Sequence, residues 1–381
     1  MVLLQTVLMS GIFAEWLRDR KTIKNKVLPA KISVIIPVHN ESHRIKGLLD
    51  TLLKAALNKA ALNKAALNDN EECGVEIIFI DDRSTDNSAE KLLQFAKEAQ
   101  GSGVKCRVIS LDENTGINCK QFALSKGIRE ARGDYFLFTD GDCEVPAGWI
   151  NEMVRRIQDG KTGAVIGPVF KKSQKNGFLY LYQCFDHAVR YNYLAGAIGL
   201  GAAGGGFGNN LIISRKALDE AGGYDAIPPS PTEDAALISK IRRMGKYRIR
   251  AVFDTAAAVE TETEKTWRSF INQTLRWNNG GLFSPEFVTR FNYNLLMIVI
   301  GTGILAVPLL PFFPGLWPMP AGVLAGMIQN TIAAFILYRY KLPKGGILIK
   351  LSYFILTLFM PVYLTLMTLM SYAGIKPKWK T

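Results

Sequence analysis

Two carboxylates separated by a single glycine follow an apolar run near the middle of the chain. Asp140 and Asp142 come directly after residues 135–138, whose aromatic and apolar side chains predict a buried strand. Open α/β sheets bind ligands at the carboxyl ends of their strands. Two carboxylates this close repel each other unless a cation lies between them, and hard oxygen ligands suit Mg²⁺ or Mn²⁺. An ordinary turn would also explain Asp-Gly-Asp, so the metal hypothesis depends on the rest of the chain.

A second pair of acids lies at the end of another apolar run. Asp81 and Asp82 follow residues 75–80, a β-branched segment that predicts a second buried strand. Ser84 and Asp86 can be explained as caps of the next helix. Helix capping does not explain two consecutive acids at the end of a strand. We therefore expect Asp81 and Asp82 to accept hydrogen bonds from a base or a ribose.

Two further groups of polar residues lie in the second half of the chain. Glu233 and Asp234 precede an expected helix, and acids are favoured at a helix N-terminus without any further function. Gln273, Arg276 and Trp277 lie in a later expected helix, where spacings of three and four place them on one face. Such a face suits either a helix on a membrane surface or a lid over phosphate and sugar.

Strand and helix patterns alternate from residue 32 to residue 280. This alternation predicts an α/β fold with a parallel, doubly wound sheet. A pentad repeat, Ala-Ala-Leu-Asn-Lys, follows the first helix. It advances about 140° per repeat on a helix and lines no single stripe, which indicates a solvated extension. The strands are expected at 32–36, 75–80, 104–111, 135–138 and 163–169, and the helices at 40–52, 89–99, 120–132, 235–244 and 267–280.

The last ninety or so residues are far more apolar than the rest. Three runs in this region are nearly free of charge, and each is long enough, or nearly so, to cross a bilayer; they are 295–313, 321–338 and 347–370. Residues 2–13 form a shorter apolar run followed by Trp16 and basic residues, which is typical of an interfacial helix. We therefore predict an interfacial helix in residues 1–26, a catalytic domain in residues 27–290 and a transmembrane region in residues 291–381.

Basic residues around the apolar runs bear on the orientation in the membrane. If the first two runs form a hairpin below a cytoplasmic domain, Arg339, Lys341 and Lys344 return to the cytoplasm, as the positive-inside rule requires. A third full span would place the lysines at 376, 378 and 380 outside, against that rule. The topology of the third run therefore stays open. We expect a multi-pass protein of the inner cell membrane with a cytoplasmic catalytic domain.

The net charge indicates which partners the protein binds, and the cysteines indicate the redox state of its interior. The formal net charge is +13, but the basic residues are scattered and no zinc-finger or RNA-binding signature appears, so nucleic acid is not expected. The charge is instead expected to face anionic lipid and a nucleotide diphosphate. The five cysteines form no Cys-x-x-Cys pattern, which favours a reduced interior over disulfides or a zinc cluster.

Taken together, six motifs in this order resemble those of glycosyltransferase family 2. The last motif resembles the QxxRW of the membrane-embedded branch, which includes cellulose, chitin and hyaluronan synthases and ceramide glucosyltransferase. The resemblance covers about residues 31–281. The motifs are Pro37-Val-His-Asn-Glu41, Asp81-Asp82-Arg-Ser84, Asp140-Gly-Asp142, Gly208-Asn-Asn210, Thr232-Glu-Asp234 and Gln273-Thr-Leu-Arg-Trp277.

The resemblance implies a GT-A fold, a nucleotide-diphosphate sugar donor (expected to be a UDP-sugar), a Mg²⁺ or Mn²⁺ ion and inversion at the anomeric carbon. It implies that Asp140 and Asp142 hold the metal and the diphosphate, and that Asp234 is the catalytic base with Glu233 beside it. It further implies a donor site and a lid over the diphosphate and acceptor. The donor site would comprise Pro37, Asn40, Glu41, Asp81, Asp82 and Lys120, and the lid Gln273, Arg276, Trp277, Asn209 and Asn210.

The expected mechanism also follows from general chemistry. An acceptor hydroxyl is a poor nucleophile, so a carboxylate must take its proton as it attacks. The metal and Arg276 would stabilise the charge on the leaving diphosphate. One base without a carboxylate nucleophile gives direct displacement onto a lipid or glycan acceptor. Two alternatives stay open: a processive polysaccharide synthase of the same family and a catalytically silent membrane scaffold that retains the fold.

Overall fold

The computed structural model describes residues 2–25, 27–66, 74–113, 118–172, 177–202, 205–230, 232–338 and 347–375. Two compact units divide the chain. We call Glu15–Val169 with Gly206–Thr261 the sheet unit, and Met1–Ala14, Phe170–Gly205 and Glu262–Thr381 the helical unit. Each is described by itself, and the domain boundaries at residues 26 and 290 stay predictions.

The sheet unit is built on a seven-stranded sheet in the order β3-β2-β1-β4-β8-β6-β9. Strands β3, β2, β1 and β4 are parallel to one another, β8 is antiparallel to β4 and β6, and β9 is parallel to β6. The predicted mixed, mainly parallel α/β sheet is thereby confirmed. Its strands are β1 (Ile32–Val38), β2 (Val75–Asp81), β3 (Lys105–Ser110), β4 (Tyr135–Phe138), β6 (Thr162–Ile166), β8 (Leu211–Ser214) and β9 (Arg248–Ala251).

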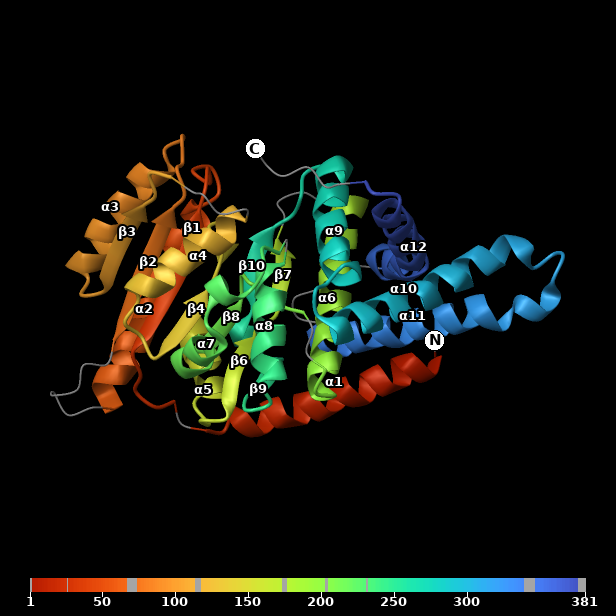
Figure 1. The fold of residues 1–381 in the computed structure, drawn as a ribbon, viewed down its shortest axis with the longest axis horizontal. Coiled ribbons are helices and arrows are strands. Elements are labelled where there is room, and N and C mark those ends of the chain that lie inside the picture. Colours follow the sequence, from red (N-terminus) through yellow and green to blue (C-terminus); the bar gives the residue numbers. More distant parts are fainter. Residues whose placement is uncertain are drawn as a thin grey trace. The chain divides into compact units, whose positions relative to one another are not determined.

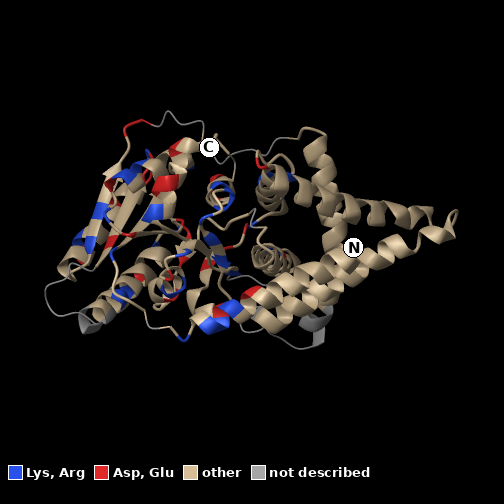
Figure 2. Ribbon diagram, turned by 60° about the horizontal axis from the view of Figure 1, so that its bottom comes forward, with Lys and Arg blue, Asp and Glu red and all other residues tan. Residues whose placement is uncertain are grey.

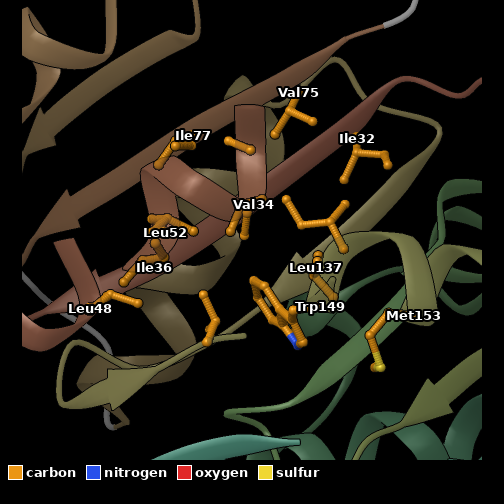
Figure 3. Packing of buried hydrophobic residues seen from close by; sticks show 14 of the residues in the cluster. Ile32, Val34, Ile36, Leu48, Leu52, Val75, Ile77, Leu137, Trp149 and Met153 are labelled. Atoms are coloured by element: carbon orange, nitrogen blue, oxygen red, sulfur yellow. The ribbon is translucent and has the colours of Figure 1, made fainter. Parts of the chain in front are cut away.

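Helices cover both faces of this sheet, because its central strands are apolar on both sides. Val34 and Ile36 of β1 pack into the cluster that includes Leu48, Leu52 and Trp149 (Figure 3). On the other face, a Cβ at Gly127 of α4 would come within 3.0 Å of side chains of β1 and β2, so that helix lies directly on the sheet. The helices of this unit are α2 (Lys46–Ala66), α3 (Ser88–Gly101), α4 (Cys119–Glu130), α5 (Trp149–Ile157), α7 (Arg215–Ala221) and α8 (Glu233–Arg243) (Figure 1).

Two expected boundaries near the first strand were wrong. Strand β1 continues through Pro37 to Val38. Since β4 ends opposite Ile35, β1 is paired on one side only beyond that point, and a proline without an N–H group is tolerated there. Helix α2 begins at Lys46 rather than Asn40, because Asn40 has a left-handed backbone with φ 53°.

The pentad repeat was expected to face solvent throughout, and this expectation was wrong. Lys59 and Asn63 of α2 are buried. Their side chains donate to the carbonyl oxygens of Leu28 and Ala30, each at 3.4 Å. The end of α2 therefore covers the chain that leads into β1. The repeat beyond Ala66 lies outside the described residues.

The structure also contains a small three-stranded sheet in the order β5-β10-β7. Strand β5 (Cys143–Glu144) follows the Asp140-Gly-Asp142 turn and pairs antiparallel with β10 (Val259–Glu262), with Glu144 opposite Glu260. Strand β7 (Val169–Lys172) stands where the chain leaves the sheet unit. The two residues after Asp142 are thus held in an extended conformation by their pairing with β10.

The helical unit contains α6 (Phe178–Gly199), α9 (Trp267–Leu282), α10 (Phe287–Ala306), α11 (Pro318–Tyr338) and α12 (Ile347–Tyr372). Helices α10 and α11 run side by side (Figure 1). Three stretches are long and apolar enough to cross a membrane, namely Phe287–Leu309, Pro314–Leu337 and Ser352–Tyr372. Figure 2 shows these helices almost without charged residues. The three expected apolar segments are confirmed, while the basic residues at 339–344 and 376–380 lie outside the described residues.

Helix α1 (Val2–Thr22) lies within the segment 1–26 in which an interfacial helix was expected, and its residues from Glu15 onward belong to the sheet unit. Both of its acids are buried there. Glu15 accepts from Arg250 Nε at 2.6 Å and Asp19 from Arg156 Nε at 2.5 Å. Asp19 also accepts the backbone N–H of Phe253 at 2.9 Å. The second half of α1 is therefore an integral part of the sheet unit.

Candidate functional site

The loops after β1 and β2 are tied to each other by hydrogen bonds. The N–H of Asn40 donates to Ser84 Oγ at 3.0 Å, and the N–H of Thr85 donates to Asn40 Oδ1 at 2.8 Å. Asn40 tolerates its left-handed backbone, whereas Arg83, with φ 57°, is in a conformation that bulky residues rarely adopt. Strain of this kind clusters at functional sites, so this pair of loops is a candidate ligand-binding edge.

Asp81 and Asp82 lie at this edge, each only 5% exposed. Arg83 Nε donates to Asp82 Oδ1 at 2.9 Å. Asp81 Oδ1 is buried and has no hydrogen-bond partner among the described residues. Because a buried carboxylate oxygen without a partner is costly, Asp81 has an acceptor to offer to a ligand. Pro37 and Glu41 flank the same loops, and the N–H of Glu41 donates to Ser88 Oγ at 2.9 Å.

The two carboxylates after β4 each face a basic side chain. Lys120 Nζ lies 2.7 Å from Asp140 Oδ1, and Arg44 Nη1 lies 3.6 Å from Asp142 Oδ2. Arg44 also lies 3.5 Å from Glu41 Oε2, which links this turn to the loop after β1. Asp140 and Asp142 are both partly exposed and can therefore be reached by a ligand.

Lys120 connects the Asp140 turn to the start of α8. Its Nζ lies 3.6 Å from Glu233 Oε1. Burial by itself lowers the pKa of Lys120, but the carboxylates of Asp140 and Glu233 outweigh it and hold that pKa well above its usual value. Burial raises the pKa of Glu233, Lys120 opposes this rise, and the neighbouring Asp234 adds to it. Acids from two separate parts of the sequence, Asp140 and the adjacent pair Glu233 and Asp234, thus gather around one lysine.

Asp234 does not act as a simple helix cap. Its Oδ2 accepts the backbone N–H of Gly208 at 2.6 Å, and its Oδ1 accepts the N–H of Ala235 at 2.8 Å. The partner Gly208 belongs to the loop before β8, twenty-six residues earlier. Asp234 therefore fixes a loop that is remote in sequence and brings its carboxylate to the same edge of the sheet as Lys120.

The structure gives Asn209 and Asn210 different surroundings. Asn209 Nδ2 is 3.7 Å from Cys143 Sγ, just after the Asp142 turn. Asn210 is fully buried: its Nδ2 donates to the carbonyl oxygens of Pro168 and Ala257, both at 2.8 Å, and its Oδ1 accepts from Trp149 Nε1 at 2.9 Å. All of these hydrogen bonds join buried groups inside the sheet unit. We therefore leave Asn210 out of the proposed lid.

Gln273, Arg276 and Trp277 lie on α9 in the helical unit, as the spacing predicted. Gln273 Nε2 donates to Glu264 Oε1 at 3.3 Å. Trp277 lies between two side chains of α6: the Arg190 guanidinium is 5.4 Å from its ring centre, and the His187 ring is 5.3 Å away, edge to face. The Trp277 ring is therefore held by a neighbouring helix that the sequence patterns did not predict.

An apolar groove opens beside the same helix. It has a volume of about 500 Å³ and is lined by α6, α9 and α12, with Phe178, Trp267, Ile271, Phe359 and Met367 among the lining residues. Helix α12 contributes Phe359 and Met367 from a stretch that is long and apolar enough to cross a membrane. The groove thus adjoins both a candidate span and the helix that carries Trp277.

Asp140 and Asp142, in the turn after β4, could bind a divalent cation if the phosphates of a bound substrate supplied further ligands. Among the residues that the structure describes, no cluster of three or more His, Cys, Asp or Glu side chains could hold a metal ion. Asp140 and Asp142 offer hard oxygen ligands, and Mg²⁺ is commonly bound through one or two carboxylates plus the phosphates of a substrate. The donor set therefore suits a cation that arrives with a diphosphate.

Sequence reasoning missed Arg44 and Gly208 as members of the site. Arg44 is three residues after Glu41, a spacing at which two side chains can meet in a helical turn. Gly208 was named only as the first residue of the motif Gly208-Asn-Asn210, and nothing in its sequence context indicated Asp234 as its partner. Long-range pairs of this kind depend on the chain path between β4 and α8.

Comparisons with known proteins identify the family and the fold of the chain. The family model described as "Glycosyl transferase family 2" matches residues 33–222, and the one described as "Glycosyl transferase family group 2" matches residues 135–371. The fold is also that of a mannosyltransferase from Pyrobaculum calidifontis, solved with GDP-Man and Mn²⁺, at a TM-score of 0.52 and 18% identity over 98% of this chain and 99% of that one. The family models and the fold together define a glycosyltransferase of GT-A architecture.

Since the second family model covers more than half of the sequence, the chain belongs to glycosyl transferase family 2. It is 27% identical to the probable glycosyltransferase YdaM of Bacillus subtilis over 76% of this chain. It is 26% identical to a beta-monoglucosyldiacylglycerol synthase of Nostoc over 62% of this chain. The chain spans 66% and 50% of the lengths of these two relatives.

Proposed function

We propose that this protein is an inverting glycosyltransferase that transfers a sugar from a nucleotide diphosphate to a lipid acceptor at the cytoplasmic face of a membrane. The observation that carries the proposal is the gathering of Asp140, Glu233 and Asp234 around Lys120 at the carboxyl edge of the sheet. That arrangement sets a diphosphate-binding turn beside a carboxylate able to remove a proton.

In this proposal the two loops after β1 and β2 hold the nucleoside. Asp82 and Asp81 accept hydrogen bonds from the base and the ribose, because their carboxylates are nearly buried and Asp81 Oδ1 has an acceptor to spare. Pro37, Asn40 and Glu41 line the pocket. Family membership favours a nucleotide-diphosphate sugar as the donor, and we expect a UDP-sugar.

Asp140 and Asp142 would hold a Mg²⁺ or Mn²⁺ ion that arrives with the donor diphosphate. The ion would neutralise part of the charge that develops on the leaving phosphate. Lys120 already lies 2.7 Å from Asp140 and would add a positive charge on the same side. Arg44 would have to release Asp142 when the ion binds, since it lies 3.6 Å from that carboxylate.

Asp234 is the proposed general base. Its carboxylate is oriented by the N–H groups of Gly208 and Ala235, so it is held in place before an acceptor arrives. It would take the proton of the acceptor hydroxyl as the oxygen attacks the anomeric carbon. Because the attack displaces the diphosphate directly, the configuration at that carbon is inverted.

The helical unit supports a lipid acceptor. The apolar groove of about 500 Å³ lies beside the helix that carries Gln273, Arg276 and Trp277, which we propose to contact the acceptor and the diphosphate. Three stretches of this unit are long and apolar enough to span a bilayer. The Nostoc relative is named as the synthase of a diacylglycerol glycolipid. We therefore favour an acceptor with hydrocarbon chains over a water-soluble sugar.

The experiment is a donor screen with the purified full-length chain in lipid nanodiscs, in which release of nucleoside diphosphate is measured with and without added diacylglycerol. We expect release with one donor, stimulation by the lipid and inhibition by a chelator. The length of the product separates a single transfer from processive synthesis. Failure to release nucleoside diphosphate from any donor would favour a silent scaffold and refute the proposal.

The first variant for that screen is Asp142→Asn. It keeps the size of the side chain but removes a carboxylate that an incoming cation needs, so we expect turnover to fall by at least about 100-fold. The matched control is Asp225→Asn, an exposed acid of the sheet unit that forms an ion pair with Arg129. Near-normal turnover of Asp142→Asn, or full wild-type turnover in excess chelator, would contradict the metal assignment.

A further inference from the structure

Helix α6 carries a buried ion pair directly beside the ring of Trp277. Asp186 and Arg190 are four residues apart on this helix, and Arg190 Nε donates to Asp186 Oδ2 at 2.7 Å. The Asp186 side chain is 0% exposed and that of Arg190 18%. The guanidinium of Arg190 lies over the Trp277 ring, 5.4 Å from its centre. A charged pair has thus been taken out of water at the point where α6 meets α9.

The geometry restrains the ring from more than one direction. His187, also on α6, meets the ring edge to face at 5.3 Å. One residue further along α9, Asn278 is fixed by two hydrogen bonds: Tyr293 Oη donates to its Oδ1 at 2.8 Å, and its Nδ2 donates to Ser371 Oγ at 3.0 Å. Helix α9 therefore has little freedom to rotate, and the orientation of the Trp277 side chain is left to Arg190 and His187.

Stability alone does not account for the Asp186–Arg190 pair. A buried ion pair often stabilises a protein no more than apolar residues of similar volume, and α6 is otherwise buried along most of its length. A guanidinium whose plane is fixed by a carboxylate can orient an aromatic ring, which an apolar side chain cannot do. It attracts the face of an aromatic ring in one orientation.

We propose that Asp186 and Arg190 are positioning residues that hold the Trp277 ring in the orientation needed to contact the acceptor. This inference rests on the proposed function, because it takes Trp277 to be an acceptor-binding residue. Asp186 acts through Arg190, and Arg190 acts through Trp277; neither needs to touch a substrate. The pair should therefore affect acceptor use and leave donor binding unchanged.

The test uses two conservative variants in the full-length chain. Arg190→Lys keeps the positive charge but removes the flat guanidinium, and Asp186→Asn keeps the size but removes the charge that orients Arg190. The matched control is Arg20→Lys. The guanidinium of Arg20 likewise lies over an aromatic ring, 4.6 Å from the centre of the Trp16 ring, but Arg20 is on α1 in the sheet unit.

One readout does not depend on activity. The chain is labelled with 5-fluorotryptophan, and the resonance of Trp277 among the six tryptophans is assigned with Trp277→Phe. Arg190→Lys and Asp186→Asn should shift or broaden that resonance, while Arg20→Lys should alter only the resonance of Trp16. An unchanged Trp277 resonance in both α6 variants would overturn the positioning role.

The second readout compares two quantities in each variant: kcat/KM for the acceptor, with diacylglycerol as the probe, and the Kd for the nucleotide. We expect Arg190→Lys to lower kcat/KM for the acceptor about tenfold, because an ammonium attracts the ring but, unlike the planar guanidinium, does not stack on it in one orientation. The nucleotide Kd should stay within about twofold of the wild-type value. The double variant Asp186→Asn with Arg190→Gln replaces the ion pair with a neutral pair and should show the same split even if a single variant folds poorly.

The outcomes separate the inference from the function on which it rests. If Trp277→Ala abolishes transfer and Arg190→Lys transfers at the wild-type rate, the inference fails and the proposed function stands. If Trp277→Ala keeps wild-type transfer, Trp277 is not an acceptor residue and the proposed lid fails with the inference. An equal loss of donor binding and acceptor use in Arg190→Lys would indicate general damage to the fold and would also overturn the inference.

Discussion

At the scale of single residues, the surroundings of Asp234 differ from those of a helix cap. A capping carboxylate accepts N–H groups of its own helix, whereas Asp234 also accepts from Gly208, in a different loop. Both carboxylate oxygens therefore have fixed directions. An amide at this position would point an NH₂ group at one of the two N–H donors, so its effect on the loop and its effect on chemistry must be measured separately.

We expect Asp234→Asn to reduce the transfer rate by about 10²–10⁴, the usual effect of losing a general base. The clash with an N–H donor should also lower the free energy of unfolding by about 1–3 kcal/mol. Nucleotide binding should survive. The measurements are single-turnover transfer, nucleotide affinity and thermal unfolding.

The control for this variant is Gly208→Ala. A Cβ at Gly208 would come 3.1 Å from Asp234 Oδ2, so it disturbs the loop but keeps the carboxylate. Its transfer rate should fall far less than that of Asp234→Asn. Equal losses in the two variants would assign Asp234 a structural role, and lost nucleotide binding in Asp234→Asn would move it to the donor site.

Lys120 gives a prediction about pH. The pKa of Glu233 is raised, so its protonation contributes stability that is complete below its usual pKa of 4.5 and is lost as the pH rises through the raised value. Removing Lys120 takes away the charge that opposes this rise. In Lys120→Met the loss should therefore extend to higher pH than in the wild type.

The measurement is the thermal unfolding midpoint of wild type and Lys120→Met from pH 4 to pH 11. The difference between them should be small near pH 4.5, grow as the pH rises toward neutrality and then stay level. Because the pKa of Lys120 is itself raised above 10.5, the stability that Lys120 contributes is lost only above that pH. A difference that is the same at every pH would contradict the electrostatic account.

At the scale of elements, helix α1 ends in a buried acid that joins it to the sheet unit. Asp19 and Arg156 are each 1% exposed, and their ion pair measures 2.5 Å. Removing one partner of such a pair leaves a buried charge, although Arg156 keeps Glu152 at 2.6 Å. We expect Asp19→Ala to cost about 3 kcal/mol, or about 6–12 °C in Tm for a unit of this size.

Arg18→Ala is the control for this prediction. Arg18 is on the same helix and forms an ion pair with Glu15 at 3.2 Å, but its side chain is 53% exposed. Exposed pairs contribute at most about 1 kcal/mol. A similar Tm for the two variants would mean that the second half of α1 is not an integral part of the sheet unit.

The elements also show which parts of the fold the sequence could predict. The run 135–138 is β4 to the residue, because a short apolar segment bounded by acids has one simple interpretation. The late start of α2 could not be predicted, since it depends on the left-handed backbone of Asn40 and its partner Ser84 in another loop. Helix α6 was missed because it is buried on nearly every side and shows no polar–apolar periodicity.

The same limits apply to the candidate site. Its acids follow strands, and the carboxyl ends of strands meet at one edge of an α/β sheet, so Asp82, Asp140 and Asp142 could be grouped in advance. The pairings of Lys120 with Glu233 and of Asp234 with Gly208 could not, because they join α4, α8 and the loop before β8. The interior role of Asn210 depends on Trp149, which no local pattern connects with it.

At the scale of the whole molecule, the three apolar stretches predict how the chain fractionates. Alkaline carbonate washing should leave the protein in the membrane pellet, because predominantly apolar stretches of 21 to 24 residues are long enough to span the hydrocarbon core. The sheet unit, along whose chain charged residues are frequent (Figure 2), has no comparable stretch among its described residues. Release of the full chain into the soluble fraction would mean that these helices are packed core helices.

The bonds between the loops after β1 and β2 have a consequence for the speed of nucleotide recognition. Besides the two bonds of Asn40, the N–H of Ser42 donates to Asp86 Oδ2 at 3.0 Å and that of Glu41 to Ser88 Oγ at 2.9 Å. The conformational entropy of these loops is thus lost during folding and need not be lost again during binding. If the loops hold the nucleoside as proposed, association should be limited by encounter rather than by loop ordering, and amide hydrogen exchange at Asn40 and Thr85 should already be slow before any nucleotide is added.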